Sequence, residues 1–220
     1  MTWISEEPTV GRLRCHLSLL MKSKSMSKRI TIIEGHPDPD TGRFHYALAE
    51  AYGAGAQQAG HELRRVRLST LGFPLLRSKH EWEEGMLPAA LAEAQEAVRW
   101  ADHLVILYPL WLGSMPALLK AFLEQVLRPG FAVSKTEAGG FGKRLLSGRS
   151  ARIVVTMGMP AFFYRLYFRA HSLKSLERNI LKFCGISPMR ESLIGLVDNR
   201  SDAWRKRWLE KMRALGHAGR

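Results

Sequence analysis

Three short stretches of the sequence gather side chains that could bind or polarise a ligand. They read EGHPDPDTGRFH (residues 34–45), YPLWLGSMP (108–116) and TMGMPAFFYRLYFRAH (156–171). The first is rich in hydrogen-bond donors, the second sets a tryptophan among leucines, and the third holds phenols and an imidazole in an aromatic run. Together they offer the polar groups and flat apolar surface that a site for a charged, ring-bearing ligand requires.

The first stretch has the composition of an anion site. It enters a helix that we expect to begin near Arg43 or Phe44, and the free N–H groups at a helix N-terminus attract anions. His36, Thr41 and His45 add further side-chain donors. A Pro/Asp-rich turn that ends in a Thr cap explains the same residues, and this stretch alone does not decide between the two. No dinucleotide fingerprint or phosphate-loop motif accompanies it.

The second stretch predicts an apolar platform at the end of a buried strand. Gly113 allows the backbone to turn or to approach a ligand closely. Leu110, Trp111 and Leu112 then form a ledge, on which a planar heterocycle could stack while its edge atoms accept hydrogen bonds from free N–H groups between them. The structural alternative is a loop whose tryptophan closes the core or an oligomer interface.

The third stretch follows another apolar run and ends at His171. Tyr164 and Tyr167 supply phenols, and a phenol and an imidazole can both stabilise developing negative charge. An aromatic helix face that packs in the core is the alternative interpretation.

These stretches connect elements that alternate along the chain. We expect strands at 29–34, 61–69, 103–108, 151–158 and 186–197, and helices at 44–60, 88–100, 117–127, about 173–183 and about 204–215. We read residues 70–87 as a loop. Such βα alternation folds into a parallel sheet with helices on both faces. The predicted fold class is therefore α/β, a flavodoxin-like three-layer sandwich with strand order 2-1-3-4-5.

The predicted topology brings the three stretches together. In open parallel sheets, ligands bind beyond the carboxyl ends of the strands, beside the point where strand order reverses. The connections after strands 1, 3 and 4 meet there. One ligand could therefore extend from an anion site to a ring site, and a phosphate joined to a flat ring describes a flavin nucleotide.

Bulk composition limits the alternatives. The formal net charge of +13 attracts nucleic acid, anionic membranes or small anions, but no nucleic-acid motif accompanies it, and a solvated basic surface is the favoured reading. Cys15 and Cys184 lack metal-ligand spacing, so we predict no metal site, and the low cysteine content is compatible with a cytoplasmic location. We expect residues 1–28 to be a flexible extension and 29–220 to form one flavin-binding domain.

The quoted motifs also carry a family resemblance. GHPDPD…RFHYAL, YPLWLGSMPALLKAFLEQVL…GFAV and VTMG…LERNILKFCGI resemble the flavodoxin-like NAD(P)H:quinone oxidoreductases. The resemblance implies a homodimer with FAD or FMN that accepts hydride from NADH or NADPH and passes two electrons to a quinone. A flavin-bearing ancillary subunit of a potassium-efflux membrane protein has the same fold and is the alternative, and a nucleic-acid binder is the third hypothesis.

The resemblance also assigns roles to residues. It implies that Tyr164 and His171 support charge on the reduced flavin. The implied cofactor contacts, together with those inferred above, are His36, Thr41, Arg43, Phe44, His45, Pro109, Leu110, Trp111, Leu112, Gly113, Thr156, Met157 and Gly158. The chain departs from vertebrate members at MGMPAFFYR, so Tyr167 stays an alternative to Tyr164. Gly42 and Arg43 are inserted relative to those members, so FAD and FMN both stay open.

Overall fold

The five strands form a single parallel sheet in the order β2-β1-β3-β4-β5. The structure is a computed structural model and describes residues 27–135 and 142–220. The strands are β1 (Arg29–Glu34), β2 (Glu62–Arg67), β3 (His103–Pro109), β4 (Ser150–Thr156) and β5 (Met189–Ile194). Every neighbouring pair is parallel, and in one row Ile32 pairs with Val105, which pairs with Arg152. The predicted fold class and strand order are confirmed.

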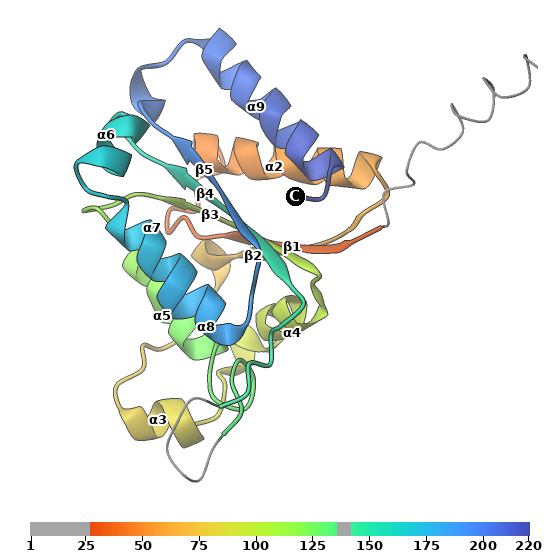
Figure 1. Cartoon of the computed structure of the whole chain (residues 1–220), viewed down its shortest axis with the longest axis vertical. Coiled ribbons are helices and arrows are strands. Elements are labelled where there is room, and N and C mark those ends of the chain that lie inside the picture. The colour runs from red at the N-terminus through yellow and green to blue at the C-terminus, as the bar shows by residue number, and fades with distance from the viewer. Residues whose placement is uncertain (1–26, 136–141) are drawn as a thin grey trace, which may run out of the picture.

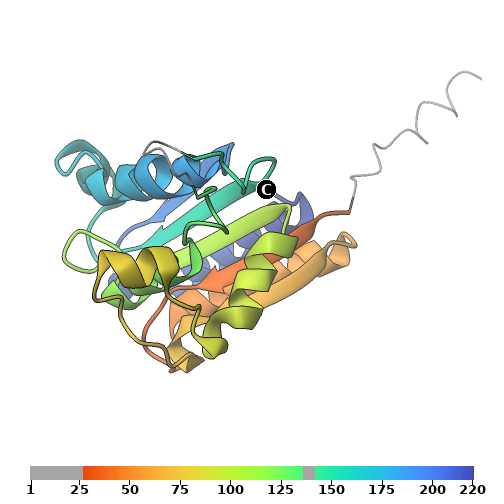
Figure 2. The same ribbon diagram turned by 90° about the horizontal axis from the view of Figure 1, so that it is seen from below.

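Helices cover both faces of this sheet (Figures 1 and 2). They are α2 (Phe44–Gln58), α3 (Lys79–Glu84), α4 (Ala92–Trp100), α5 (Ala117–Val126), α6 (Ala161–Leu166), α7 (His171–Ser175), α8 (Lys182–Cys184) and α9 (Asp202–His217). A π-helical segment, η3 (Leu176–Leu181), joins α7 to α8, and short 3₁₀ turns are η1 (Leu68–Thr70), η2 (Ala89–Leu91) and η4 (Val197–Asn199).

Alternate residues of the central strands point to opposite faces of the sheet, and each face has its own hydrophobic core. Ile32 and Val105 pack with α2 and α9 on one face, while Leu104 and Ile106 pack with α4, α5 and the α7–α8 helix on the other. All seven residues of β3 are buried, as expected for a central parallel strand. Each fully buried Ile or Leu contributes roughly 1.5–3 kcal/mol relative to leaving it exposed.

Two glycines permit α2 and α9 to pack backbone to backbone. A Cβ atom on Gly55 would lie 1.9 Å from the carbonyl oxygen of Arg213, and one on Gly216 would lie 1.9 Å from that of Tyr52. Any larger residue at either position would force the helices apart. Gly55 inside α2 is therefore needed for the close packing of this helix against α9.

The structure differs from the predictions in one unforeseen helix and at several element ends; the strand predicted at 61–69, for example, spans Glu62–Arg67. Residues 70–87 contain the helix α3, which the Ser78 side chain caps by accepting the Glu81 N–H. The last strand is shorter than the predicted region 186–197, and the helix predicted at 88–100 begins with a 3₁₀ turn. Of the predicted extension, residues 1–26 lie outside the described residues. Ser27 and Lys28 hydrogen-bond to Gly60 and His61 of the domain.

Candidate functional site

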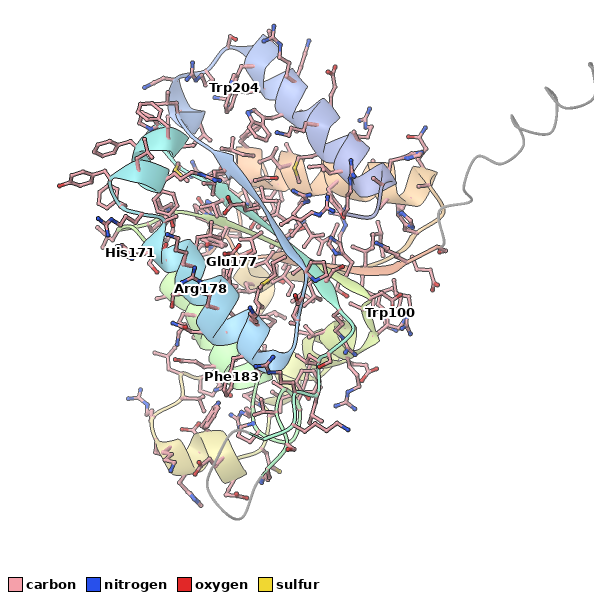
Figure 3. The ribbon with its side chains drawn as sticks, in the orientation of Figure 1. Trp100, His171, Glu177, Arg178, Phe183 and Trp204 are labelled. Carbon is pink, nitrogen blue, oxygen red and sulfur yellow. The ribbon has the colours of Figure 1, made fainter. Side chains whose placement is uncertain are left out.

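A cavity of about 620 Å³ lies where the predicted connections meet. It is at the carboxyl edge of the sheet, the end at which Figure 3 shows His171, whereas Trp100 lies at the opposite end. Its walls come from the connections after β1, β3, β4 and β5 and from the first turn of α9. The lining residues are His36, Asp38, Gly42, Arg43, Phe44, His45, Pro109, Leu110, Trp111, Thr156, Met157, Gly158, Val197, Asp198 and Arg205.

The N-terminus of α2 opens into this cavity without a cap. Arg43 takes the N-cap position with extended backbone, and no side chain hydrogen-bonds to the helix end there. Because Arg43 and not Thr41 is the N-cap residue, the alternative of a Thr-capped turn is wrong. Thr41, predicted as a cofactor contact, is exposed and lies outside the cavity lining. The N–H groups of Phe44 and His45 donate to no acceptor among the described hydrogen bonds, and such groups bind anions.

His45 carries the strongest sign of a missing partner. Its side chain is buried, 3% exposed, and neither ring nitrogen has a hydrogen-bond partner among the described residues. Burial, together with the smaller effects of the nearby His36 and Arg67, lowers the pKa of His45 to about 3. A buried imidazole with two unsatisfied nitrogens is costly, and among the residues that line the cavity His45 alone has buried side-chain atoms without a partner.

The rest of this loop is held rigidly by its own hydrogen bonds. Asp38 accepts the Asp40 N–H at 2.9 Å and the Arg43 Nε–H at 2.8 Å. Those bonds lower the pKa of Asp38, the Asp40 N–H being the largest cause. The Tyr46 hydroxyl donates to the Asp38 carbonyl at 2.7 Å. Arg43 lines the cavity, but ion pairs with Asp38 and Asp40 already offset its charge.

His36 links this loop to the tryptophan. Its Nδ1 accepts the Asp38 N–H at 3.1 Å, and burial lowers its pKa. The rings of His36 and Trp111 meet edge to face with centroids 5.7 Å apart. The tryptophan therefore closes the cavity beside the imidazoles, and it stays 47% exposed.

Trp111 sits on a tight hairpin. The Trp111 N–H donates to the Ser114 carbonyl, and the Trp111 carbonyl accepts the Ser114 N–H, both at 2.9 Å. Leu112 and Gly113 lie between them with φ of 47° and 77°. The Leu110 N–H donates to the Thr156 carbonyl at 2.7 Å. The expectation of free N–H groups between these residues is thus wrong for Leu110 and Trp111. Leu112 is fully exposed, and neither it nor Gly113 lines the cavity.

The connection after β4 forms another wall of the cavity. Met157 donates its N–H to the Ile194 carbonyl at 2.9 Å and accepts the Val197 N–H at 3.3 Å. These bonds join the connections after β4 and β5. A Cβ atom on Gly158 would approach the Asp198 carboxylate to 3.1 Å. Thr156, Met157 and Gly158 all line the cavity, where the sequence predicted them.

Tyr164 and His171 lie outside the cavity lining. The Tyr164 hydroxyl is within 2.7 Å of the Ser172 Oγ and accepts the Leu173 N–H at 3.2 Å, so it is buried and already bonded. In the turn before α7, Ala170 has a left-handed φ of 50° and donates its N–H to the Tyr164 carbonyl at 3.1 Å. His171 begins α7 and is exposed, and Tyr167 stacks on Phe163 at the surface.

Five lining residues were absent from the predicted contacts: Asp38 and Gly42 within the first stretch, and Val197, Asp198 and Arg205 after β5. The Arg205 Nη2 donates to the Val197 carbonyl at 3.3 Å, and its guanidinium carbon lies 5.5 Å from the centre of the Phe44 ring. It therefore adds a positive charge beside the uncapped helix end. The signal was available, because β5 is also parallel and its connection must reach the same sheet edge.

A second hollow of about 610 Å³ lies between α3, α5 and the η3–α8 segment. Its lining is mainly apolar and includes Trp82, Leu123 and Ile180. None of the described residues that line it has a buried side-chain nitrogen or oxygen without a partner, and the Ser78 side chain caps the start of α3 there. The polar cavity at the carboxyl edge is therefore the stronger candidate for a charged ligand.

Comparisons with known proteins agree with this geometry. A protein named "Uncharacterized NAD(P)H oxidoreductase" from Haemophilus influenzae is 28% identical over 183 residues, covering 81% of this chain and 89% of that protein. NAD(P)H dehydrogenase [quinone] 1 of Rattus norvegicus is 24% identical and covers 82% of this chain and 76% of its own. A potassium-efflux ancillary protein, KefG of an Enterobacter strain, is 41% identical over 71 residues, 32% of this chain and 36% of its own.

Solved structures share the fold. The NAD(P)H:quinone oxidoreductase of Methanothermobacter marburgensis matches with a TM-score of 0.72 and 24% identity, over 87% of this chain and 96% of that one. An FMN-dependent NADH-azoreductase of Bacillus anthracis in complex with FMN has a TM-score of 0.66 and 15% identity, over 86% and 97% of the two chains.

A family model described as "Flavodoxin-like fold" matches residues 28–215. This range includes all five strands and every residue that lines the cavity. The resemblance seen in the sequence motifs is thereby confirmed. The chain belongs to this family of proteins with the flavodoxin-like fold.

Proposed function

We propose that this protein is a flavin-dependent NAD(P)H oxidoreductase that reduces quinones or similar acceptors by two electrons. The observation that carries the proposal is the pairing, in one cavity, of an uncapped helix N-terminus beside unpartnered His45 with an apolar wall at Trp111. The names of the relatives from Haemophilus influenzae and Rattus norvegicus support the activity.

The residues present fit a flavin nucleotide. The α2 N-terminus, His45 and Arg205 would hold the phosphate, because they bring N–H donors and positive charge to one end of the cavity. Trp111 with Pro109 and Leu110 would hold the ring system. The backbone from Thr156 to Gly158 would face the polar edge of that ring.

When bound, a flavin supplies the hydride chemistry, accepting from NAD(P)H and giving to a quinone. The chain binds and orients it. The helix dipole and Arg205 would stabilise the negative charge of the phosphate. The hydrogen-bonded loop from Asp38 to Arg43 keeps the helix end in position. Trp111 shields one side of the cavity from water.

That Tyr164 and His171 support charge on the reduced flavin stays a prediction. Because the Tyr164 hydroxyl is bonded to Ser172 and Leu173, we expect it to act by positioning α7. FMN and FAD stay alternatives, which chromatography of the released flavin would distinguish. NADH and NADPH also stay alternatives, which turnover assays with each nucleotide would distinguish. A homodimer and a cytoplasmic location also stay predictions, and light scattering on the purified protein checks the first.

The test of the proposed function is direct. Protein purified or reconstituted with FMN should show visible flavin absorbance and should oxidise NADPH or NADH rapidly when menadione is added. Protein that stays colourless after reconstitution contradicts the proposal at the level of the cofactor.

The partial match to the potassium-efflux ancillary protein favours a second candidate, a flavin-bearing subunit of a membrane protein. A yellow protein that turns over neither nicotinamide with menadione would favour this subunit over the enzyme. Rapid turnover without any partner would favour the enzyme.

A further inference from the structure

A group of buried polar side chains lies toward the amino edge of the sheet, and none of them lines the cavity. Figure 3 shows Trp100 at this edge, and β3 begins three residues after it. We call the group the Arg152 cluster. Its members are Tyr52 of α2, His103 and Ser150 at the starts of β3 and β4, Arg152 of β4 and Ser192 of β5. Tyr52, His103 and Arg152 are 0%, 2% and 4% exposed.

Strand register places the cluster on one face of the sheet. His103 pairs with Ser150, and Val105, two residues further along β3, pairs with Arg152. Because side chains alternate between the two faces of a strand, His103 and Arg152 share the face of Val105. The core on that face also contains Tyr52, and α2 and α9 cover it (Figure 1). The cluster is therefore enclosed between the sheet and these two helices.

The cluster has hydrogen-bonding groups that the chain does not use. The Arg152 Nη1 donates to the Ser192 Oγ at 2.8 Å, and the His103 Nδ1 lies 2.8 Å from the Ser150 Oγ. The Arg152 Nε, the His103 Nε2 and the Tyr52 hydroxyl are buried and have no partner among the described residues. Because buried polar groups are almost always hydrogen-bonded, three such atoms in one cluster indicate a missing partner.

The cluster also holds a buried positive charge without a counter-ion. None of the ion pairs among the described residues involves Arg152 or Arg190, its register neighbour on β5. Burial lowers the pKa of the Arg152 guanidinium; Tyr52 opposes this, and Arg190 and Arg220 act in the same direction as burial. An isolated buried charge is costly, so the missing partner is an anion.

The titratable groups that act on His103 are all basic. They are Lys28, Arg152, Arg190 and His61, and burial, with their smaller effects, lowers the pKa of His103 to about 3. No carboxylate is among them. Water in the cluster would complete hydrogen bonds, as buried water does, but it would leave the charge of Arg152 uncompensated.

Burial restricts the size of the ligand. Nucleic acid and lipid headgroups, which a net charge of +13 attracts, cannot reach side chains that are almost fully buried. In the described ranges 27–135 and 142–220, no helix is long and apolar enough to cross a membrane. A monatomic anion is small and accepts hydrogen bonds from several directions at once.

We propose that the Arg152 cluster binds a single small inorganic anion, of the size of chloride, between the sheet and the α2–α9 layer. The Arg152 Nε–H and the Tyr52 hydroxyl donate to it. With the Ser150 hydroxyl donating to Nδ1 of His103, the Nε2–H of that ring donates to the anion as well. Because the cluster exists only in the folded chain, the anion stabilises the native state.

Anion-dependent unfolding of the full-length protein tests the proposal. Circular dichroism gives the Tm at constant ionic strength while sodium chloride replaces sodium gluconate, whose anion is too large for the cluster. The test variants are Arg152→Met, which removes the charge at similar length, and Tyr52→Phe, which removes only a hydroxyl without a partner among the described residues. The control Arg207→Met makes the same chemical change at an exposed position of α9.

We expect chloride at about 100 times its Kd to raise the Tm of the wild type and of Arg207→Met by about 5–10 °C. Arg152→Met should show no such rise, and Tyr52→Phe should need several-fold more chloride for a rise of the same size. Chloride at the start of α2 would stabilise the wild type and Arg152→Met alike, so the difference between them belongs to the cluster. In gluconate, Tyr52→Phe should unfold at the wild-type temperature, which confirms that it folds normally.

Bromide locates the ion directly. Anomalous diffraction from wild-type crystals soaked in bromide should show a peak within hydrogen-bond reach of the Arg152 Nε. The same peak should be absent from crystals of Arg152→Met.

Three results would overturn the proposal. The first is a wild-type Tm that does not change when chloride replaces gluconate. The second is an equal rise in the wild type and Arg152→Met, which would assign the stabilisation to another place. The third is bromide found at the protein surface and not in the cluster, an adventitious ion only. None of these measurements depends on a bound flavin, because no member of the cluster lines the cavity.

Discussion

The start of α2 and the turn between α6 and α7 both bring a tyrosine and a histidine to the carboxyl edge of the sheet. At α2, Tyr46 braces the loop and His45 is buried with both ring nitrogens unpartnered. At α7, Tyr164 is bonded to its own neighbours and His171 is exposed. The difference teaches that a buried polar side chain without a hydrogen-bond partner is the better candidate for contact with a ligand, since buried polar groups otherwise find partners within the protein.

The largest expected difference between the start of α2 and the α6–α7 turn comes from placing a negative charge at the histidine of each. We expect His45→Asp to weaken FMN binding at least about 100-fold, because a carboxylate at the helix N-terminus repels the phosphate and competes for its N–H donors. The matched variant His171→Asp should change FMN affinity less than about twofold. Fluorescence titration measures both. Equal losses in the two variants would remove the distinction between the regions.

A smaller effect is expected at the apolar wall. Trp111→Ala should weaken FMN binding about tenfold, since a stacked ring contributes roughly 0.5–1.5 kcal/mol beyond its buried area. Leu112→Ala, one residue along and fully exposed, should have almost no effect. Isothermal titration of both variants checks this, and a larger loss at Leu112 would place the platform elsewhere.

The two tyrosines should respond in opposite ways. Tyr164→Phe leaves the buried Leu173 N–H without its acceptor, so it should lower the free energy of unfolding by about 1–3 kcal/mol while FMN affinity stays unchanged. Tyr46→Phe frees the Asp38 carbonyl and should weaken FMN binding about threefold. Urea unfolding and FMN titration of each variant separate stability from binding. A large loss of affinity in Tyr164→Phe alone would support its predicted place beside the flavin.

The smallest effect concerns pH. Because burial lowers the pKa of His45 from 6.5 to about 3, the unfolded chain binds the proton more readily between those values. Stability from this group is present above about pH 6.5 and is lost as the pH falls. As the pH falls from 7 to 5.5, the free energy of unfolding of the wild type should decrease by about 1 kcal/mol more than that of His45→Gln, which lacks the titrating group. Identical acid sensitivity in urea titrations would show that His45 is not buried neutral.

Much of the fold followed from local pattern. The continuously apolar run of β3 and the alternation of helices and strands lead to the sheet order by the rules of parallel topology. The helix α3 was not foreseen, because Lys79–Glu84 buries no residue and so lacks the periodic apolar face that reveals a helix. Its Ser78 cap was the only local signal.

The site could be predicted in position but only partly in detail. Parallel strands bring their carboxyl-end connections together, so the convergence of the loops near His36, Trp111 and Thr156 was inferable. The bonding of Tyr164 to Ser172 and Leu173 was not, because the turn between them has left-handed backbone at Arg169 and Ala170, neither of which is glycine. The hydrogen bond from the Leu110 N–H to the Thr156 carbonyl could not be predicted either, because the two residues are 46 positions apart along the chain.

The central claim is that the uncapped start of α2 binds the phosphate of a flavin nucleotide. The most direct measurement compares the affinity of the wild-type protein for FMN and for riboflavin, which lacks only the phosphate. Our account predicts that FMN binds at least about 100-fold more tightly, because N–H donors and Arg205 serve that phosphate alone. Equal affinity for the two compounds would contradict it.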